Sequence, residues 1–205
     1  ITSVNFSASG ELLVYTSYEG EVTIMNAATH EILKNFSIEG NVYYAAFSPD
    51  GTKLAIAYVS EPNEKQQNQG IRMNYIVNIY ETGKYTKQKT LRLSKPNDDD
   101  GEKFGAKLFE TYRYNTFNCE FNPGGNYLAS GSMGKNIAFY SFDYNKFAPE
   151  YKGHSKRVLF VTFSPDGTYL ASASKDENVK LWNVTSAGTI ITLKGHTSAV
   201  NSASF

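Results

Sequence analysis

Histidines at a regular spacing are the side chains of this chain best suited to chemistry. His154 and His196 lie 42 residues apart, and each follows a glycine. Either could act as a general base or a metal ligand, since a neutral imidazole can do both. A metal site also needs several ligands close together, and no such cluster surrounds either histidine in the sequence. Both histidines are therefore predicted to have structural roles.

The single cysteine is the next candidate. Cys119 lies two residues before Phe121 in an apolar stretch, with no histidine nearby in the sequence to activate it. A thiol in such a stretch is predicted to be buried and unreactive. One cysteine excludes an internal disulfide and a zinc site built from cysteines, and it favours a reducing, intracellular compartment, either cytoplasmic or nuclear.

Charged groups supply the remaining candidates. Asp98–Asp100 lacks the spaced ligands and final glutamate of a calcium loop, so it is predicted to be a solvated loop, with contact to a basic partner as the alternative. Lys152, Lys156 and Arg157 could contact phosphate, but they are predicted to be ordinary surface residues. The sequence contains no nucleophile elbow and no phosphate-binding loop. We therefore expect no catalytic residue, no metal and no cofactor.

The overall composition argues against two large classes of function. Basic and acidic residues number 20 each, so the formal net charge is zero. Nucleic-acid-binding proteins usually carry excess positive charge and rely on arginine, of which this chain has four. No apolar stretch approaches the roughly 20 residues that span a bilayer. We expect neither membrane insertion nor direct binding of nucleic acid.

Five phenylalanines define the elements that must position these residues. Phe6, Phe47, Phe121, Phe163 and Phe205 each end a short apolar stretch, and their successive gaps are 41, 74, 42 and 42 residues. The first four are followed by turn sequences such as Ser-Pro-Asp-Gly. A period near 42 residues in a chain rich in strand-forming residues predicts an all-β fold, a β-propeller with one blade per repeat.

The fourth repeat has the clearest pattern. Alternating apolar residues and turn signals predict four strands, at Val158–Phe163, Tyr169–Ser174, Val179–Asn183 and Thr189–Leu193. Gly153-His154 precedes these strands, and Trp182-Asn183 ends the third. This combination resembles a WD40 repeat, with Trp-Asn where the family has Trp-Asp. The chain is accordingly identified as a member of the WD40-repeat family.

The resemblance implies a hydrogen-bonded network inside the fourth blade. In the family, a histidine, a strand serine or threonine, a turn aspartate and a tryptophan hold one another in place. The matching residues here are His154, Ser172 (with Ser174 as the alternative), Asp176 and Trp182, and His196 stands at the next such position. The first and third repeats have Met25 and Tyr140 at the tryptophan position. Those blades are therefore predicted to rely on apolar packing.

The repeat boundaries define the predicted domain organisation. We expect one domain over 1–205, with blades at about 1–40, 41–115, 116–157 and 158–199 and the inner strand of a fifth at 200–205. Met25, Tyr140 and Trp182 each lie 19 residues after their phenylalanine, which predicts one shared register, with Tyr80 in the same place in the second repeat. The family resemblance implies part of a seven-bladed ring, with a five-bladed ring as the alternative.

The second repeat is longer than the others. Phe47 and Tyr80 lie 33 residues apart instead of 19, and Tyr80 and Phe121 lie 41 apart instead of 23. Insertions of 14 and 18 residues therefore fall at about 60–74 and 94–115. The first is polar and is predicted to lack regular structure. The spacing assigns a role to neither.

The resemblance also implies a docking surface. In WD40 proteins, partner peptides often bind the face formed by the starts of the inner strands and the turns after the second strands. The residues at these positions are Thr2, Tyr18, Tyr43, Phe117, Met133, Leu159, Lys175 and Asn201. An aromatic-rich set on a polar rim is typical of an interface hot spot. The alternative is that several of them line the central channel and pack together.

These observations predict a non-catalytic scaffold for protein–protein interaction, a WD40 subunit or domain of a multiprotein complex that binds other subunits or peptides. The repeat order also resembles the small WD-repeat subunit of the eukaryotic translation initiation factor three complex. The long loop is similar to loops in mRNA-export and mitotic-checkpoint WD40 adaptors. An enzyme on a propeller scaffold is the alternative from a different functional class.

Overall fold

The protein is almost entirely β-structure. The computed structural model describes residues 1–68, 74–93, 117–131, 135–147 and 151–205. These residues form four antiparallel sheets of four strands each, which confirms the predicted all-β fold built from repeated blades. The sheets are numbered blades one to four along the chain. Met133, Asp98–Asp100 and the whole of the second insertion lie outside the described residues.

Each blade is a meander in which consecutive strands pair. Blade one contains β1 (Ser3–Phe6), β2 (Leu12–Thr16), β3 (Glu21–Asn26) and β4 (Ile32–Ser37). Blade two contains β5 (Asn41–Phe47), β6 (Lys53–Ser60), β7 (Asn74–Glu81) and β8 (Thr86–Arg92). Blade three contains β9 (Cys119–Phe121), β10 (Tyr127–Ser130), β11 (Ala138–Ser141) and β12 (Lys146–Phe147). Blade four contains β13 (Val158–Phe163), β14 (Tyr169–Ser174), β15 (Val179–Asn183) and β16 (Thr189–Leu193).

The spacing of the phenylalanines sets one register for all four blades. In each blade, the phenylalanine that ends the first strand lies opposite a leucine of the second strand: Leu13, Leu54, Leu128 or Leu170. Each leucine in turn lies opposite one residue of the third strand: Met25, Tyr80, Tyr140 or Trp182. The predicted shared register is confirmed. It is kept by tight turns, in which Gly51 and Gly167 have φ angles of 69° and 72° that glycine adopts without steric cost.

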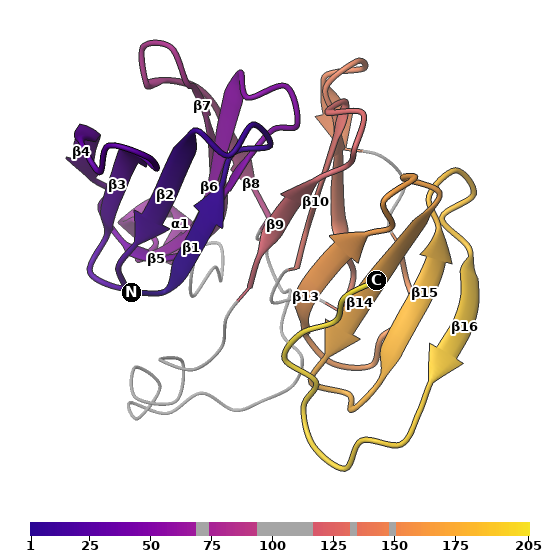
Figure 1. The fold of residues 1–205 in the computed structure, drawn as a ribbon. Helices are drawn as coiled ribbons and strands as arrows, with labels where there is room; N and C mark the ends of the chain where they lie inside the picture. Colours follow the sequence, from indigo (N-terminus) through magenta and orange to yellow (C-terminus); the bar gives the residue numbers. More distant parts are fainter. Residues whose placement is uncertain (69–73, 94–116, 132–134, 148–150) are drawn as a thin grey trace.

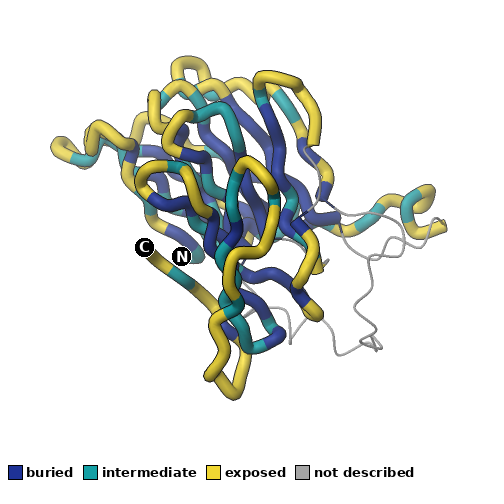
Figure 2. The backbone as a smooth tube through the Cα atoms, turned by 90° about the vertical axis from the view of Figure 1, so that its right-hand side faces the viewer, coloured by how far each residue is buried: buried dark blue, intermediate teal, exposed yellow. Residues whose placement is uncertain are grey.

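The blades stand side by side in chain order, with their first strands along one inner edge (Figure 1). Along that edge β1 contacts β5, β5 contacts β9, and β9 contacts β13. The core lies between neighbouring blades, in three apolar clusters. Figure 2 shows buried residues in the middle of the molecule and exposed residues at its periphery, in the turns and outer strands.

The equivalent phenylalanines differ in burial according to their blade. Phe47, Phe121 and Phe163 are buried, at 9%, 5% and 5% exposure, whereas Phe6 is 62% exposed. Phe47 packs in the cluster that blade two shares with blade one. The matching side chain of blade one therefore points away from blade two. Identical register thus produces different burial, because the neighbouring blade supplies the covering atoms.

The polar insertion in blade two contains regular structure, contrary to the prediction. Residues Glu64–Asn68 form a short helix, α1. Its start is held by a reciprocal capping pair: the Gln66 amide donates to Asn63 Oδ1 at 3.0 Å, and the Asn63 amide donates to Gln66 Oε1 at 2.9 Å. Such a pair satisfies two of the amides that a helix start leaves without partners. Composition alone does not reveal this capping pair.

The strand predicted at 200–205 is not formed. Val200 is buried and its amide donates to the Ser174 carbonyl at 3.0 Å, but none of the described sheets includes this segment. A strand exists through a ladder of hydrogen bonds with a neighbour. A single bond to the end of β14 is not such a ladder.

Candidate interaction face and the blade-four network

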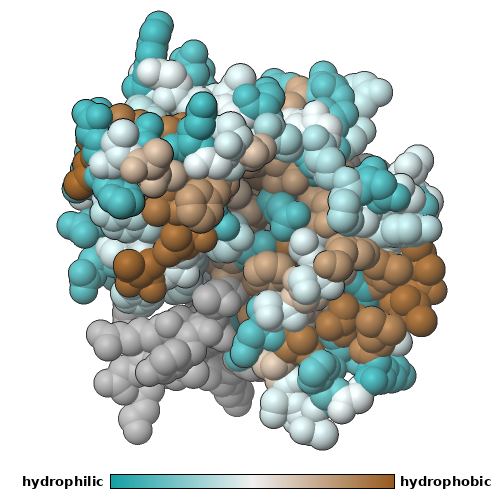
Figure 3. Space-filling view, viewed as in Figure 1, coloured by the Kyte–Doolittle hydropathy of each residue, from teal (hydrophilic) through white to brown (hydrophobic). Residues whose placement is uncertain are grey.

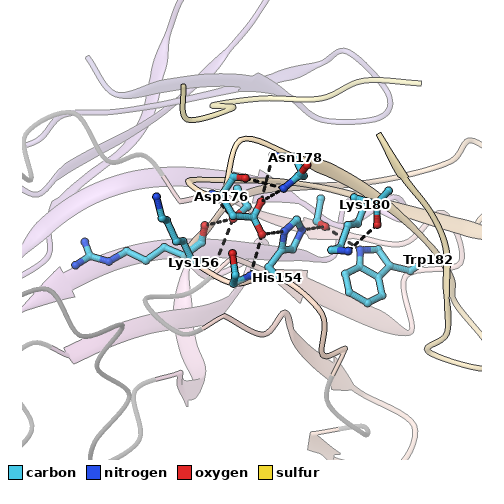
Figure 4. Close-up of polar contacts among 11 residues, drawn as sticks. His154, Lys156, Asp176, Asn178, Lys180 and Trp182 are labelled. Carbon is cyan, nitrogen blue, oxygen red and sulfur yellow. Dashed lines mark hydrogen bonds and ion pairs between the residues drawn. The ribbon is translucent and has the colours of Figure 1, made fainter. Parts of the chain in front are cut away.

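Four polar side chains of blade four form a continuous hydrogen-bonded chain (Figure 4). His154 precedes β13, Ser172 lies in β14, Asp176 lies in the turn after β14, and Trp182 lies in β15. His154 Nδ1 is 2.8 Å from Asp176 Oδ2, and His154 Nε2 is 2.7 Å from Ser172 Oγ. Trp182 Nε1 donates to Ser172 Oγ at 2.8 Å. The structure therefore brings together the four residues that the family resemblance matched.

The proton positions in this chain follow from the inventory of donors and acceptors. Burial lowers the pKa of His154 below its ordinary value of 6.5, and this outweighs the opposing effect of the Asp176 carboxylate. A neutral His154 has one N–H, which must face the carboxylate because an ionised carboxylate only accepts. Nε2 then accepts the Ser172 hydroxyl proton, and the Ser172 oxygen accepts the indole N–H of Trp182. Every polar side-chain atom of this four-residue network therefore has a hydrogen-bond partner.

Asp176 is the anchor of the network. Burial alone would raise the pKa of Asp176, but hydrogen bonds from the Ser155 amide and from His154 outweigh it, and the net effect is a lowered pKa. The Asn178 amide binds the second carboxylate oxygen, Oδ1, at 3.1 Å. The carboxylate therefore also closes the turn between β14 and β15.

Serine, histidine and aspartate in a hydrogen-bonded series are also the components of a nucleophilic triad. Here Ser172 and Trp182 are 0% exposed, and the indole N–H already binds the serine oxygen. No substrate carbonyl can approach that hydroxyl. The series therefore stabilises the blade and has no access to a substrate.

Two further residues of the predicted network lie elsewhere. Ser174 donates to the Arg157 carbonyl at 2.7 Å, so it ties β14 to the start of β13 and is not the network serine. His196 is exposed and lies apart from the network. The partners of His154 all come from its own blade, and the described residues contain no further sheet to supply an equivalent set for His196.

The predicted docking residues fall into two groups. Tyr43, Phe117 and Leu159 are buried, at 5%, 4% and 4% exposure, so their assignment to an exposed hot spot is wrong. Tyr43 and Phe117 belong to the core cluster between blades two and three, with ring centroids 5.6 Å apart. The inner ends of neighbouring blades converge, and aromatic side chains there cover one another.

The second group of docking residues remains accessible. Thr2, Tyr18 and Lys175 are half-buried, and Asn201 is exposed. Tyr18 packs edge-on against Tyr43, with ring centroids 5.8 Å apart, so its position is held from below. We call Thr2, Tyr18, Lys175 and Asn201 the rim. It is more polar than the sequence suggested, because its aromatic members are mostly turned into the core.

Cys119 and the basic residues around His154 differ in burial. Cys119 is fully buried, and burial raises the pKa of its thiol well above the ordinary value of 9.0, so the unreactive protonated form prevails. Arg157, predicted to be at the surface, is 2% exposed. It directly precedes β13, the inner strand of blade four, which contacts β9 and β10 of blade three. Lys152 and Lys156 are exposed, as predicted.

Asn118 is a structural residue that the sequence reasoning missed. Its side-chain amide donates to the Val161 carbonyl at 2.7 Å and its Oδ1 accepts from the Val161 amide at 2.8 Å, as a neighbouring strand would. Glu120 adds an acceptor for the Phe163 amide at 3.1 Å. These side chains fasten blade three to blade four. Asn118 directly precedes β9, and a polar residue between the apolar Phe117 and Cys119 was the available signal.

Exposed apolar side chains gather on the two end blades. Ile190, Ile191 and Leu193 of β16 are 51%, 47% and 51% exposed, and Val4 and Phe6 of β1 are 51% and 62% exposed. Figure 3 shows hydrophobic residues over blade four on the right of the view and over blade one on the left. Exposed patches of this kind are typical of surfaces that contact other protein.

Comparison with known protein families finds a match for part of the chain. The family model described as WD domain, G-beta repeat, matches residues 115–141 and 145–183, which include most of blades three and four. No curated protein matches the chain significantly. In the described part of the chain no helix has the length and apolar character needed to cross a bilayer. Nor do the described ranges contain three or more His, Cys, Asp or Glu residues grouped as a metal site.

Proposed function

This chain is a WD40-repeat protein, and on that premise we propose that it is a non-catalytic scaffold, a subunit or domain of a multiprotein complex that holds other subunits or peptides. Proteins of this kind generally bind other proteins. We further propose that the protein is intracellular, where a buried, reduced Cys119 is stable.

The proposal rests on one observation: the potentially reactive side chains are held inside the protein. His154, Ser172 and Asp176 are the residues best suited to catalysis, and all three are committed to hydrogen bonds inside blade four. Cys119 is likewise enclosed by the core. The accessible surface carries polar rim residues and apolar patches instead, which suit protein contacts better than bond-making chemistry.

A capture experiment tests this proposal. Purified wild-type protein and the Tyr18→Ala/Lys175→Ala variant would be used as baits, and bound proteins quantified by mass spectrometry. Tyr144→Ala is the matched control, since Tyr144 is 69% exposed and lies in the turn between β11 and β12, at the opposite end of the strands. We expect the rim variant alone to lose specific partners. Partners retained equally by all three baits would contradict docking at the rim.

A further inference from the structure

A groove of about 840 Å³ lies between blade one and blade two. One wall is the connection 37–41 between the blades, the other is the inserted segment 61–66, and the floor is formed by β6 and β7 of blade two. The volume lies within the range of about 300–1,000 Å³ that is typical of ligand sites. Unlike the core clusters, it is lined mainly by polar side chains.

The floor of the groove carries hydrogen-bond donors without acceptors. Asn78 is 3% exposed, and its amide nitrogen lies 3.3 Å from the Tyr58 hydroxyl and 3.5 Å from the Tyr80 hydroxyl. Thr90 donates to Asn78 Oδ1 at 2.9 Å, which orients the amide so that both phenol oxygens accept from it. Burial raises the pKa of Tyr58 and Tyr80, so both keep their protons. Within the described residues neither phenol O–H has an acceptor, and both residues line the groove.

The charges around the floor are divided between the two sides. Lys87 and Arg92 are exposed residues of β8, placed opposite Tyr80 and Ile76 of β7. Glu39 and Glu61 belong to the two walls. Burial is the main reason that the pKa of Tyr58 is raised. Arg92 lowers this pKa and Glu39 raises it, so both charges act on the floor of the groove. The β8 side is therefore cationic, and the walls are acidic.

Specific contacts hold both walls of the groove in place. Gly40 has a φ of 139°, and a Cβ there would lie 2.5 Å from the Val59 carbonyl oxygen, so only glycine brings the connection this close to β6. On the other side, the Asn74 side-chain amide donates to the Glu61 carbonyl and to Gln66 Oε1, both at 3.1 Å. Asn74 thus fixes the insertion to the start of β7. The insertion, to which spacing assigned no role, is a wall of the groove.

We propose that this groove binds a peptide segment of a partner protein that carries an acidic side chain and, nearby, a basic one. The carboxylate of the peptide accepts hydrogen bonds from the O–H groups of Tyr58 and Tyr80. It also forms an ion pair with Arg92, whose planar guanidinium matches the geometry of a carboxylate. The basic residue lies toward Glu39 and Glu61. A uniformly acidic peptide is disfavoured by these two carboxylates. The proposal rests on the scaffold function and names a second docking surface with its own ligand chemistry.

The test uses arrays of short synthetic peptides that contain one Glu and one Lys at varied separation, with matched arrays in which Gln replaces Glu. Fluorescently labelled full chain is applied as wild type, Arg92→Gln, Tyr58→Phe/Tyr80→Phe, and the control Lys84→Gln, an exposed lysine outside the groove. We expect Glu peptides to bind wild type and control, and to lose about tenfold in affinity with Arg92→Gln and with the double variant. Gln peptides should bind all four proteins weakly and equally.

Two results would overturn the proposal. One is equal binding of Glu and Gln peptides, or of wild type and Arg92→Gln. The other is displacement of the peptides by inorganic phosphate at far lower concentration than by acetate, which would make the groove a phosphate site. If no array peptide binds while the rim variant still loses its partners, the groove proposal fails and the scaffold function stands. If the wild-type bait also captures no specific partner, the scaffold function fails with it.

Discussion

Blades two and four carry polar clusters at the same register. The clusters differ in whether all of their hydrogen-bonding groups have a partner inside the blade. Trp182 of blade four and Tyr80 of blade two both lie opposite a leucine of their second strand. In blade four, every polar group from Trp182 to Asp176 has a partner inside the blade. In blade two, Asn78 satisfies only the phenol oxygens, and the O–H groups face a groove. A closed cluster stabilises a blade, whereas an open one can bind a ligand.

The difference originates two positions away in the strands. Where blade four has Ser172 opposite Lys180, blade two has Ile56 opposite Asn78. A serine is small and can both accept and donate, so it links tryptophan to histidine in one line. An isoleucine cannot, and the polar group moves outward to Asn78. Asn78 is itself buried and donates to the phenol oxygens of Tyr58 and Tyr80, so solvent or a ligand must accept the hydrogen bonds of the two phenol O–H groups.

Removing the tryptophan should have the largest effect on the closed cluster. Trp182 is 0% exposed and is the largest of the fully buried side chains, so Trp182→Ala should lower the free energy of unfolding by about 3–5 kcal/mol. Urea unfolding would measure it. Trp182→Phe keeps much of the buried area and should lose less. A loss below about 1 kcal/mol for Trp182→Ala would contradict the central place of this residue in blade four.

Breaking the polar chain should have a smaller effect. His154→Ala or Asp176→Ala should each lower the free energy of unfolding by about 1–3 kcal/mol, because each leaves a buried partner unsatisfied. The double variant should lose less than the sum, since one substitution already interrupts the chain. Chemical denaturation of the four proteins would give this coupling. Strict additivity, or wild-type stability of either single variant, would mean that the chain is not a unit.

The closed cluster should also make stability depend on pH. The folded state lowers the pKa of His154 below 6.5, so the unfolded chain binds more protons as the pH falls below that value. The stabilisation from neutral His154 is therefore complete above about pH 6.5 and is lost toward the folded pKa. Thermal melts of wild type and His154→Gln between pH 7.5 and 5 should show the steeper loss in wild type. Parallel curves would contradict a neutral, buried His154.

Asp176 adds a second loss at lower pH. Its folded pKa is lowered from the ordinary value of 3.8, so its contribution is present above that value and disappears as the pH falls through the folded pKa. An Asp176→Asn variant should lack this step in the same melts.

The smallest effect is expected in the open cluster. Tyr80→Phe removes an O–H that donates to no described group, so the free energy of unfolding should change by no more than about 0.5 kcal/mol. Calorimetry of the variant beside Trp182→Phe would compare the two clusters directly. A loss for Tyr80→Phe as large as for Trp182→Phe would show that blade two is closed as well.

Much of the fold could be predicted because strand pairing is local. The distance from each phenylalanine to its turn and to the third strand determines which residues face one another in a meander, whatever surrounds the blade. That is why the spacing in the sequence aligns Met25, Tyr80, Tyr140 and Trp182 correctly. The four network residues of blade four could be matched for the same reason.

Burial could not be predicted in this way, because it depends on the neighbouring blade. Tyr43 and Phe117 lie at positions where a propeller can expose a side chain or cover it, and only the approach of blades two and three encloses them. Arg157 was misjudged for the same reason, since it was predicted to be at the surface and is buried. The groove depends on three segments that are distant in sequence: the connection 37–41, the insertion 61–66 and the β7–β8 pair.

Spacing and residue type were therefore sufficient for the repeat, its register and the partners within one blade, since those contacts are made between strands joined by short turns. Exposure, the joints between blades and the groove emerged when separate blades were set against one another. Those properties belong to pairs of surfaces, and no single repeat encodes both members of a pair.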